Sequence, residues 1–130
     1  MEYESSVLEV VGLKSDLSSF YNNRKVLITG HTGFKGSWLA IWMKELEANV
    51  VGYALEPRTE NDNYVVCGLE NKIIHIDADL RDYRYLKSVF EKYEPEFVFH
   101  LAAQSLVNIS YDNPLITWQT NLIGGQLRAA

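Results

Sequence analysis

The sequence predicts an α/β fold, in which helices cover both faces of a parallel β-sheet. Two observations predict it. Four short apolar runs, at residues 26–28, 50–55, 72–77 and 97–103, alternate with longer segments of helical or turn character. Strands that alternate with helices in this way are typical of doubly wound sheets with parallel strands. The second observation is a glycine-rich turn, which joins the first apolar run to the first amphipathic segment.

Val26–Ile28 is the first expected strand, because so short an apolar run is typical of a strand buried on both faces. Gly30, Gly33 and Gly36 follow it. Gly30 permits a tight turn, Gly33 lets a ligand's phosphates approach the main chain, and Gly36 lets the next helix lie against the strand. Such a turn directs free N–H groups and the positive end of a helix towards a diphosphate. This context favours nucleotide binding, although the first glycine interval is one residue longer than in G-x-G-x-x-G.

The segment after the glycine turn predicts an amphipathic helix that ends near Asn49. Its apolar residues fall on one stripe at helical spacing, which we expect to face the sheet. The stripe consists of Trp38, Leu39, Trp42, Met43 and Leu46, and the opposite side carries Lys44, Glu45 and Glu47.

The stretch TGHTGFKGSWLA, residues 29–40, resembles the glycine turn of the extended short-chain dehydrogenase/reductases that act on nucleotide sugars, the NAD-dependent epimerase/dehydratase family. Within that family it is most similar to the CDP-glucose 4,6-dehydratases, because of the run Phe34–Trp38. The resemblance extends from Phe20 to the last residue. It implies a Rossmann-type doubly wound sheet with strand order 3-2-1-4 and a nucleotide-sugar substrate. It also implies NAD as cofactor, bound in this turn by Gly30, Thr32, Gly33, Phe34, Lys35 and Gly36.

Composition limits the other classes of function. The 130 residues suffice for about one domain, and the net charge of -5 argues against nucleic acid as a partner. The single cysteine, Cys67, cannot form an internal disulfide, which fits a reducing cytoplasm. No apolar run approaches the roughly 20 residues that span a membrane. We therefore expect a cytoplasmic protein without a membrane partner or a bound metal, with residues 1–24 as a partly ordered leader anchored by an aromatic residue.

The second expected strand, residues 50–55, ends where dinucleotide sites usually carry an acidic residue for the adenosine ribose. This chain has Ala54 there, followed by Glu56 and Arg58. A glutamate would favour NAD by accepting from the 2′-hydroxyl, whereas an arginine could pair with the extra phosphate of NADP. The residues leave both open, and the resemblance favours NAD.

The third expected strand, residues 72–77, contains His75, which we interpret as a half-buried strand residue rather than a catalyst. After this strand the resemblance places Asp79 and Leu80 beside the adenine ring, where the carboxylate accepts from the exocyclic amine and the aliphatic side chain covers the ring. Asp82 is expected to cap the next helix. Its apolar stripe is Tyr85, Leu86, Val89, Phe90 and Tyr93, and Pro95 follows its end.

The fourth expected strand, residues 97–103, runs into small residues. The resemblance marks Leu101, Ala102, Ala103 and Gln104 as the wall beside the diphosphate and the nicotinamide ribose; close packing of strand on helix is the alternative reason for the alanines. Gln104 and Ser105 lie beyond the strand's carboxyl end, where open α/β sheets bind substrates, and are candidate sugar contacts. A helix should begin at residues 112–114. In the resembling enzymes an Asn at the position of Asn121 bends this helix and supports the catalytic lysine.

The resembling enzymes use a catalytic Tyr-x-x-x-Lys pair, in which the lysine lowers the pKa of the phenol. Two pairs in this chain have that spacing. Tyr21 and Lys25 lead into the first strand, while Tyr83 and Lys87 lie off the apolar stripe of a helix after the third strand instead of the fifth. We therefore expect no catalytic residue in this chain.

The interpretation that fits these observations is the N-terminal part of a dinucleotide-binding domain, residues 25–130, of a longer homo-oligomeric enzyme. The catalytic and sugar-nucleotide-binding parts would lie further along that protein, and the sheet here would be incomplete. A non-catalytic NAD(P)-binding regulatory module, a related sugar-nucleotide epimerase and a GDP-mannose-type dehydratase are the alternatives.

Overall fold

The computed structural model describes residues 12, 14–103 and 107–123, and it contains a four-stranded parallel sheet in the order β3-β2-β1-β4. This is the predicted order. The central pair is β1 (Lys25–Thr29) and β2 (Asn49–Ala54), flanked by β3 (Ile74–Asp77) next to β2 and β4 (Phe97–His100) next to β1. Three of the strands are shorter at one end or both than the apolar runs suggested, since β2 ends before Leu55, β3 begins at Ile74 and β4 ends at His100.

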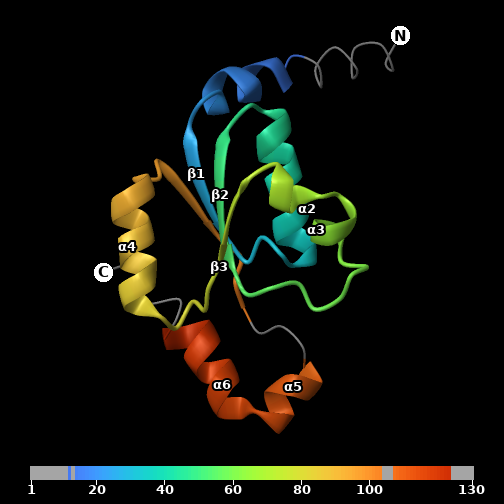
Figure 1. The fold of residues 1–130 in the computed structure, drawn as a ribbon, viewed down its shortest axis with the longest axis vertical. Helices are drawn as coiled ribbons and strands as arrows, with labels where there is room; N and C mark the ends of the chain where they lie inside the picture. Colours follow the sequence, from blue (N-terminus) through green and yellow to red (C-terminus); the bar gives the residue numbers. More distant parts are fainter. Residues whose placement is uncertain (1–11, 13, 104–106, 124–130) are drawn as a thin grey trace.

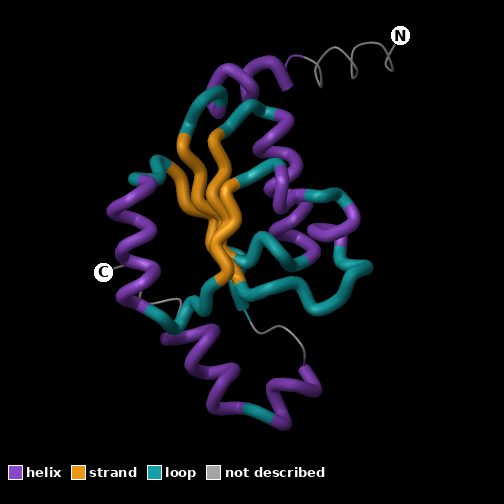
Figure 2. The backbone as a smooth tube through the Cα atoms, viewed as in Figure 1, coloured by secondary structure: helices purple, strands orange, loops and turns teal. Residues whose placement is uncertain are grey.

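Helices cover both faces of this sheet (Figure 1). On one face lie α2 (Phe34–Glu45), α3 (Asn63–Val66) and the 3-10 turn η1 (Leu69–Asn71); on the other lies α4 (Tyr83–Tyr93). Beyond the carboxyl ends of the strands the chain forms α5 (Val107–Asp112), α6 (Pro114–Trp118) and the π-helical turn η2 (Gln119–Ile123). Figure 2 shows loops meeting at that end of the sheet. None of the described helices combines the length and the apolar character that crossing a membrane requires.

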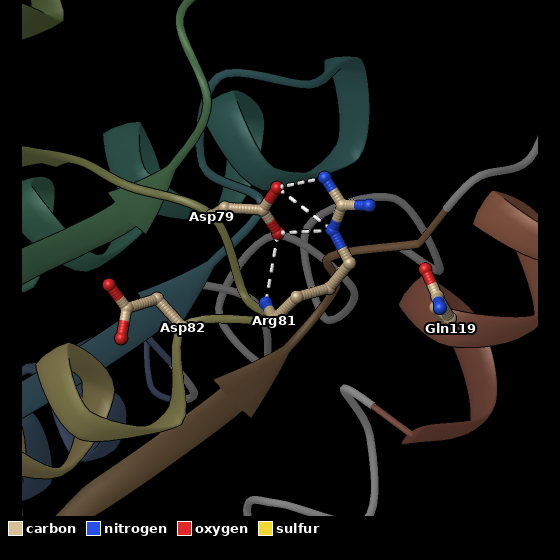
Figure 3. A pocket seen from close by; sticks show the side chains of 4 residues that line it. All are labelled: Asp79, Arg81, Asp82 and Gln119. Atoms are coloured by element: carbon tan, nitrogen blue, oxygen red, sulfur yellow. Dashed lines mark hydrogen bonds and ion pairs between the residues drawn. The ribbon is translucent and has the colours of Figure 1, made fainter.

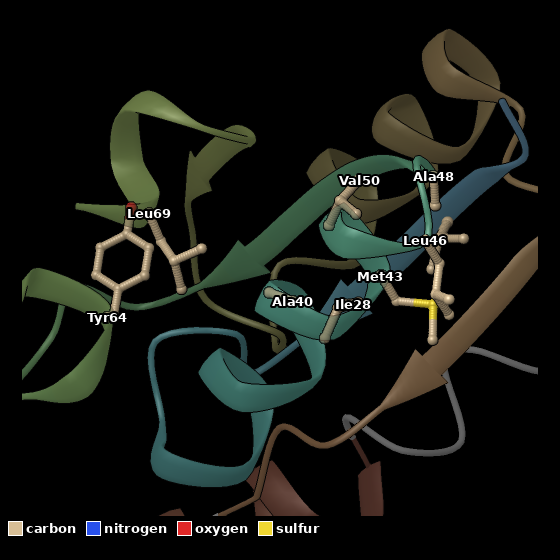
Figure 4. Packing of buried hydrophobic residues seen from close by; sticks show 9 residues of the cluster. Ile28, Ala40, Met43, Leu46, Ala48, Val50, Tyr64 and Leu69 are labelled. Carbon is tan, nitrogen blue, oxygen red and sulfur yellow. The ribbon is translucent and has the colours of Figure 1, made fainter. Parts of the chain in front are cut away.

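The core consists of two apolar clusters, one on each face of the sheet. Successive residues of β1 belong to different clusters, because successive side chains of a strand point to opposite faces of the sheet. Val26 and Ile28 pack with α2, α3 and η1, the cluster seen in Figure 4. Leu27 packs with the apolar side of α4, including Leu86 and Val89. The two clusters leave the carboxyl ends of the strands free to form a site.

The helix α2 differs from the prediction in which side it turns to the sheet. Its buried residues are Gly36, Ser37, Ala40 and Met43, whereas Trp38 and Trp42 are 53% and 52% exposed. Leu46 is fully buried, as expected. The prediction for the tryptophans was wrong because α2 lies so close to the sheet that only small side chains fit beneath its first turns, and the large rings occupy the outer face.

The helix α4 agrees better with its predicted stripe. Leu86 and Val89 are buried, but Tyr85 is 46% exposed. The Asp82 carboxylate accepts the backbone N–H of Tyr85 at 3.0 Å, which confirms the expected helix cap. Tyr83 and Lys87 are both exposed, in agreement with a pair that lies off the stripe.

The segment before β1 is anchored to the sheet by aromatic packing. Residues 14–21 are helical, and the Tyr21 ring meets the ring of Phe97 on β4 with centroids 5.5 Å apart. The Phe20 ring contacts both of these rings. Arg24 and Glu96 add an exposed ion pair at 2.7 Å, which solvent screening weakens. Tyr21 and Lys25 lie in different elements, so they share no helix face.

Candidate dinucleotide-binding site

The glycine turn connects the end of β1 to the beginning of α2. Gly30 adopts a φ of +76°, as a tight turn requires, and the N–H of Gly33 donates to its carbonyl at 3.1 Å. Gly33 is the N-cap of α2, and no side chain caps this end. The first N–H groups of an α-helix have no intrahelical partner, so this uncapped end offers donors and a positive dipole end to an anion.

Close main-chain contacts hold the turn in place. A Cβ at Gly30 would lie 2.7 Å from the N atom of Ala102, and a Cβ at Gly36 would lie 2.1 Å from the carbonyl oxygen of Gly30. The side-chain oxygen of Thr29 accepts the N–H of Ala102 at 3.3 Å. Ala102 therefore packs closely against the turn, so close packing is at least part of the reason for an alanine at this position.

A groove of about 910 Å³ runs over the turn and across the carboxyl ends of the strands. Every predicted cofactor residue within the described part of the chain lines it: Gly30, Thr32, Gly33, Phe34, Lys35, Gly36, Asp79, Leu80, Leu101, Ala102 and Ala103. Gln104 and Ser105 lie outside the described residues. Residues that are 73 positions apart in the chain are thus brought to one groove.

At the far end of the groove Arg81 binds Asp79 (Figure 3). The Asp79 carboxylate accepts a hydrogen bond from the backbone N–H of Arg81 at 2.9 Å. It also accepts from the Arg81 guanidinium, whose Nε is 3.0 Å from both carboxylate oxygens and whose Nη2 is 2.5 Å from one of them. The Arg81 side chain holds the pKa of the Asp79 carboxyl below its usual value. A shallower pocket of about 520 Å³ adjoins this pair and is lined also by Asp82 and Gln119. The carboxylate predicted to receive the adenine amine is thus already engaged.

Leu80 and Tyr53 form the floor at this end. Leu80 lines the groove but is only 5% exposed, since most of it packs in the cluster beneath α4. The Tyr53 hydroxyl donates to the Asp79 carbonyl at 2.8 Å. Burial, followed by the charges of Asp82 and Asp79, raises the pKa of Tyr53 to about 12, so this hydroxyl keeps its proton at neutral pH. It therefore acts as a fixed donor that braces the loop after β3.

The end of β2 brings both candidate selectivity residues to the groove. Glu56 and Arg58 are exposed there, and the Thr32 hydroxyl donates to the Leu55 carbonyl at 2.8 Å, which ties this loop to the glycine turn. The Arg58 N–H donates to the Asp62 carboxylate at 2.9 Å. An acceptor and a cation thus lie two positions apart in sequence where dinucleotide sites distinguish NAD from NADP.

Asn121 lies in η2, exposed and outside the set of residues that line the groove. Its neighbour Thr120 does line it. The turn η2 is π-helical, and the supporting role expected of Asn121 stays a prediction. Among the described residues no group of three or more His, Cys, Asp or Glu could hold a metal ion.

Sequence reasoning missed His31. This residue of the glycine turn points inward, is fully buried, and its Nε2 lies 2.7 Å from Nδ1 of His75. His75 is half-buried on β3, as predicted. The signal in the sequence was Gly52, a glycine in the interior of a strand, which often marks the close approach of another group.

Comparisons with known proteins agree with this geometry. The protein family described as GDP-mannose 4,6 dehydratase matches residues 27–127. The CDP-glucose 4,6-dehydratase of Salmonella typhimurium is 42% identical over 106 residues, which cover 82% of this chain and 30% of that protein. The chain thus spans about 30% of the length of this relative.

Two of the solved structures that share the fold are epimerases. The epimerase Mth375 of Methanothermobacter thermautotrophicus has a TM-score of 0.71 at 28% identity, covering 88% of this chain and 33% of that one. The UDP-glucose 4-epimerase of Brucella ovis, solved in complex with NAD, has a TM-score of 0.65 at 26% identity, covering 80% and 30%. The strand order, the glycine turn and the family match together show that the chain belongs to the GDP-mannose 4,6 dehydratase family, within the extended short-chain dehydrogenase/reductases.

Proposed function

We propose that this chain is the NAD-binding portion of a nucleotide-sugar 4,6-dehydratase that converts CDP-glucose to CDP-4-keto-6-deoxyglucose. The observation that supports it most is the groove in which the glycine turn, the loop after β3 and the end of β4 meet. The choice of CDP-glucose rests on the 42% identity to a relative with that name.

The residues of the groove fit a dinucleotide. The uncapped N-terminus of α2 and the bare main chain at Gly33 would hold the diphosphate, and the exposed Lys35 would balance its charge. Asp79 would bind the adenine edge by sharing its carboxylate with Arg81, which already donates to both oxygens. Leu101–Ala103 would form the wall on the nicotinamide side. When bound, NAD supplies the hydride acceptor for the sugar C4 and the hydride donor for C6 after water is lost across C5 and C6. This chain's own residues bind and orient the cofactor for that exchange.

Gly33→Ala is expected to separate binding from folding. The new Cβ would stand in the groove where the diphosphate meets the main chain, and its nearest neighbour, the Gly30 carbonyl oxygen, is 3.4 Å away, which is ordinary contact. We expect NAD affinity to fall about tenfold or more, which corresponds to a loss of about 1.4 kcal/mol or more of binding free energy. Titration calorimetry of the 130-residue chain with NAD measures it.

Gly68→Ala is the matched control for that measurement. Gly68 has a φ of +60°, and a Cβ added there would meet no atom within 4 Å. It lies outside the groove, so an alanine should lower stability by about 1 kcal/mol and leave NAD affinity unchanged. Equal affinity of the Gly33→Ala and unsubstituted chains would contradict the proposed site. Titration of the same samples with NADP compares the two cofactors. Tighter binding of NAD would indicate Glu56 as the dominant neighbour of the ribose, and tighter binding of NADP would indicate Arg58.

The catalytic part is proposed to lie outside these 130 residues. Two tyrosine–lysine pairs in the chain have the Tyr-x-x-x-Lys spacing. Tyr83 and Lys87 are exposed on α4, and Tyr21 and Lys25 lie just before and at the start of β1; none of the four lines the groove. We propose residues 1–24 as a leader and 25–130 as the first part of the dinucleotide-binding domain of a cytoplasmic homo-oligomer. The 130-residue chain, mixed with NAD and CDP-glucose, should form no 4-keto sugar. Product above the level of a chain-free control would contradict this.

A related specificity is the second candidate. It is favoured by the family described as GDP-mannose 4,6 dehydratase and by the similarity to a UDP-glucose 4-epimerase structure. A longer protein that contains this chain, assayed with CDP-glucose, GDP-mannose and UDP-glucose, would separate the three. Turnover of none of them, with NAD bound, would favour a non-catalytic regulatory module.

A further inference from the structure

His31 occupies an unusual place for a residue of a phosphate-binding turn. It stands between Gly30 and Thr32, both of which line the groove, yet its own side chain is fully buried behind them. Its ring fills the space over Gly52 in the middle of β2. A Cβ at Gly52 would lie 2.4–2.5 Å from three atoms of the imidazole, so the strand has no side chain where the ring of the turn is seated.

The ring is fixed from two further elements. Its Nε2 and the Nδ1 of His75 on β3 are 2.7 Å apart, and the two ring centroids are separated by 4.9 Å. The rings of His31 and Tyr64 of α3 lie edge to face, with centroids 5.3 Å apart and an interplanar angle of 80°. Tyr64 also contacts His75, with centroids 5.4 Å apart. One side chain of the turn is therefore held by β2, β3 and α3.

The charge state of His31 indicates what the ring does. Burial, followed by the charge of His75, lowers the pKa of His31 to about 3, so the ring is neutral at physiological pH and supplies no cation to a phosphate. The Tyr53 carbonyl acts to raise the pKa of His31, but this carbonyl already accepts the Gly30 N–H at 2.9 Å. The Nδ1 atom of His31 has no hydrogen-bond partner among the described residues. The contribution of the ring is its position.

We propose that His31 is a positioning residue for dinucleotide binding, whose ring, seated over Gly52 and hydrogen-bonded to His75, holds the Gly30–Gly36 turn in the shape that binds phosphate. This rests on the proposed NAD site. Phosphate binding by main-chain N–H groups depends on their orientation, and a turn built from glycines has little rigidity of its own. A buried ring immediately after Gly30 restricts the turn without entering the groove.

Two single variants test the proposal. His31→Ala removes the ring, and Gly52→Ala places a methyl group in its seat, so each should weaken NAD binding about tenfold or more at a temperature where circular dichroism shows the variant folded. The double variant tests the seat itself: the new methyl group fills part of the space that the ring has left. We expect it to bind NAD no more weakly than Gly52→Ala alone, a non-additivity typical of residues in contact.

The outcomes separate this proposal from the proposed function. If the unsubstituted chain binds no NAD, the NAD site itself is wrong. If it binds NAD and Gly33→Ala does not, while folded His31→Ala binds as tightly as the unsubstituted chain, then the ring is a packing residue and the positioning role is wrong.

His31→Phe is the second variant, for the case in which His31→Ala fails to fold. It keeps most of the ring volume without the nitrogen atoms. Unchanged NAD affinity in His31→Phe would overturn the role of the His75 hydrogen bond, and weakened affinity would support it.

Discussion

Gly36→Ala is expected to lower the free energy of unfolding by roughly 3 kcal/mol or more. The new Cβ would lie 2.1 Å from the carbonyl oxygen of Gly30, 2.7 Å from its carbonyl carbon and 2.8 Å from the Cα of His31. All three atoms belong to the main chain, so no side chain can swing away. The first turn of α2 must move off the sheet, which opens the cluster that contains Ile28 and Ala40. Urea unfolding followed by circular dichroism measures the change.

Gly33→Ala is the matched control for this effect. It adds the same methyl group three residues earlier, at a φ of -74° and with no atom nearer than 3.4 Å, so we expect a change in stability of less than about 1 kcal/mol. Equal midpoints for the two variants would show that α2 does not approach β1 as closely as described. The pair distinguishes two uses of glycine in one turn, since Gly36 serves packing and Gly33 leaves room for a ligand.

The parts of the fold that sequence could predict are those set by local signals. Each strand is a short apolar run, and the strand order 3-2-1-4 was expected from the resemblance to the extended short-chain dehydrogenase/reductases. The glycine spacing marked the turn, and the resemblance marked residues such as Asp79 and Ala102 that line the same groove. These predictions needed no knowledge of how closely any two elements approach.

The parts that sequence could not predict depend on such distances. The apolar spacing of Trp38 and Trp42 is that of a buried stripe, but the contact of α2 with Gly30 leaves no room for large rings, so they are half exposed. Arg81 reaches back two residues to Asp79, and nothing in the sequence distinguishes that from an arginine in water. The seat of His31 over Gly52 joins residues 21 positions apart and is visible only in space.

The protein is expected to lose stability as the pH falls from about 6.5, because of His31. In the unfolded chain this imidazole takes up a proton near pH 6.5, while burial keeps the folded ring neutral down to about pH 3. Between these values the unfolded state binds more protons, so the free energy of unfolding decreases with falling pH, by up to about 1.4 kcal/mol per pH unit from this one group. Urea midpoints at pH 7.0, 6.0 and 5.0 measure the slope.

His31→Phe isolates that contribution. The groups in contact with the ring are His75 and Tyr64, and both remain in the variant, as do the carboxyl groups of Asp79 and Glu96. The carboxyl groups of Asp62, Asp79 and Glu96 have lowered pKa values in the folded protein, so the stability that they contribute is lost at lower pH. There the carboxyls of the unfolded chain, and then the folded groups, are protonated near and below pH 4. Between pH 7 and 5 the difference in slope between the two proteins therefore reports His31. Parallel slopes would mean that the imidazole is hydrated in solution, and in that case the ring could not be seated over Gly52.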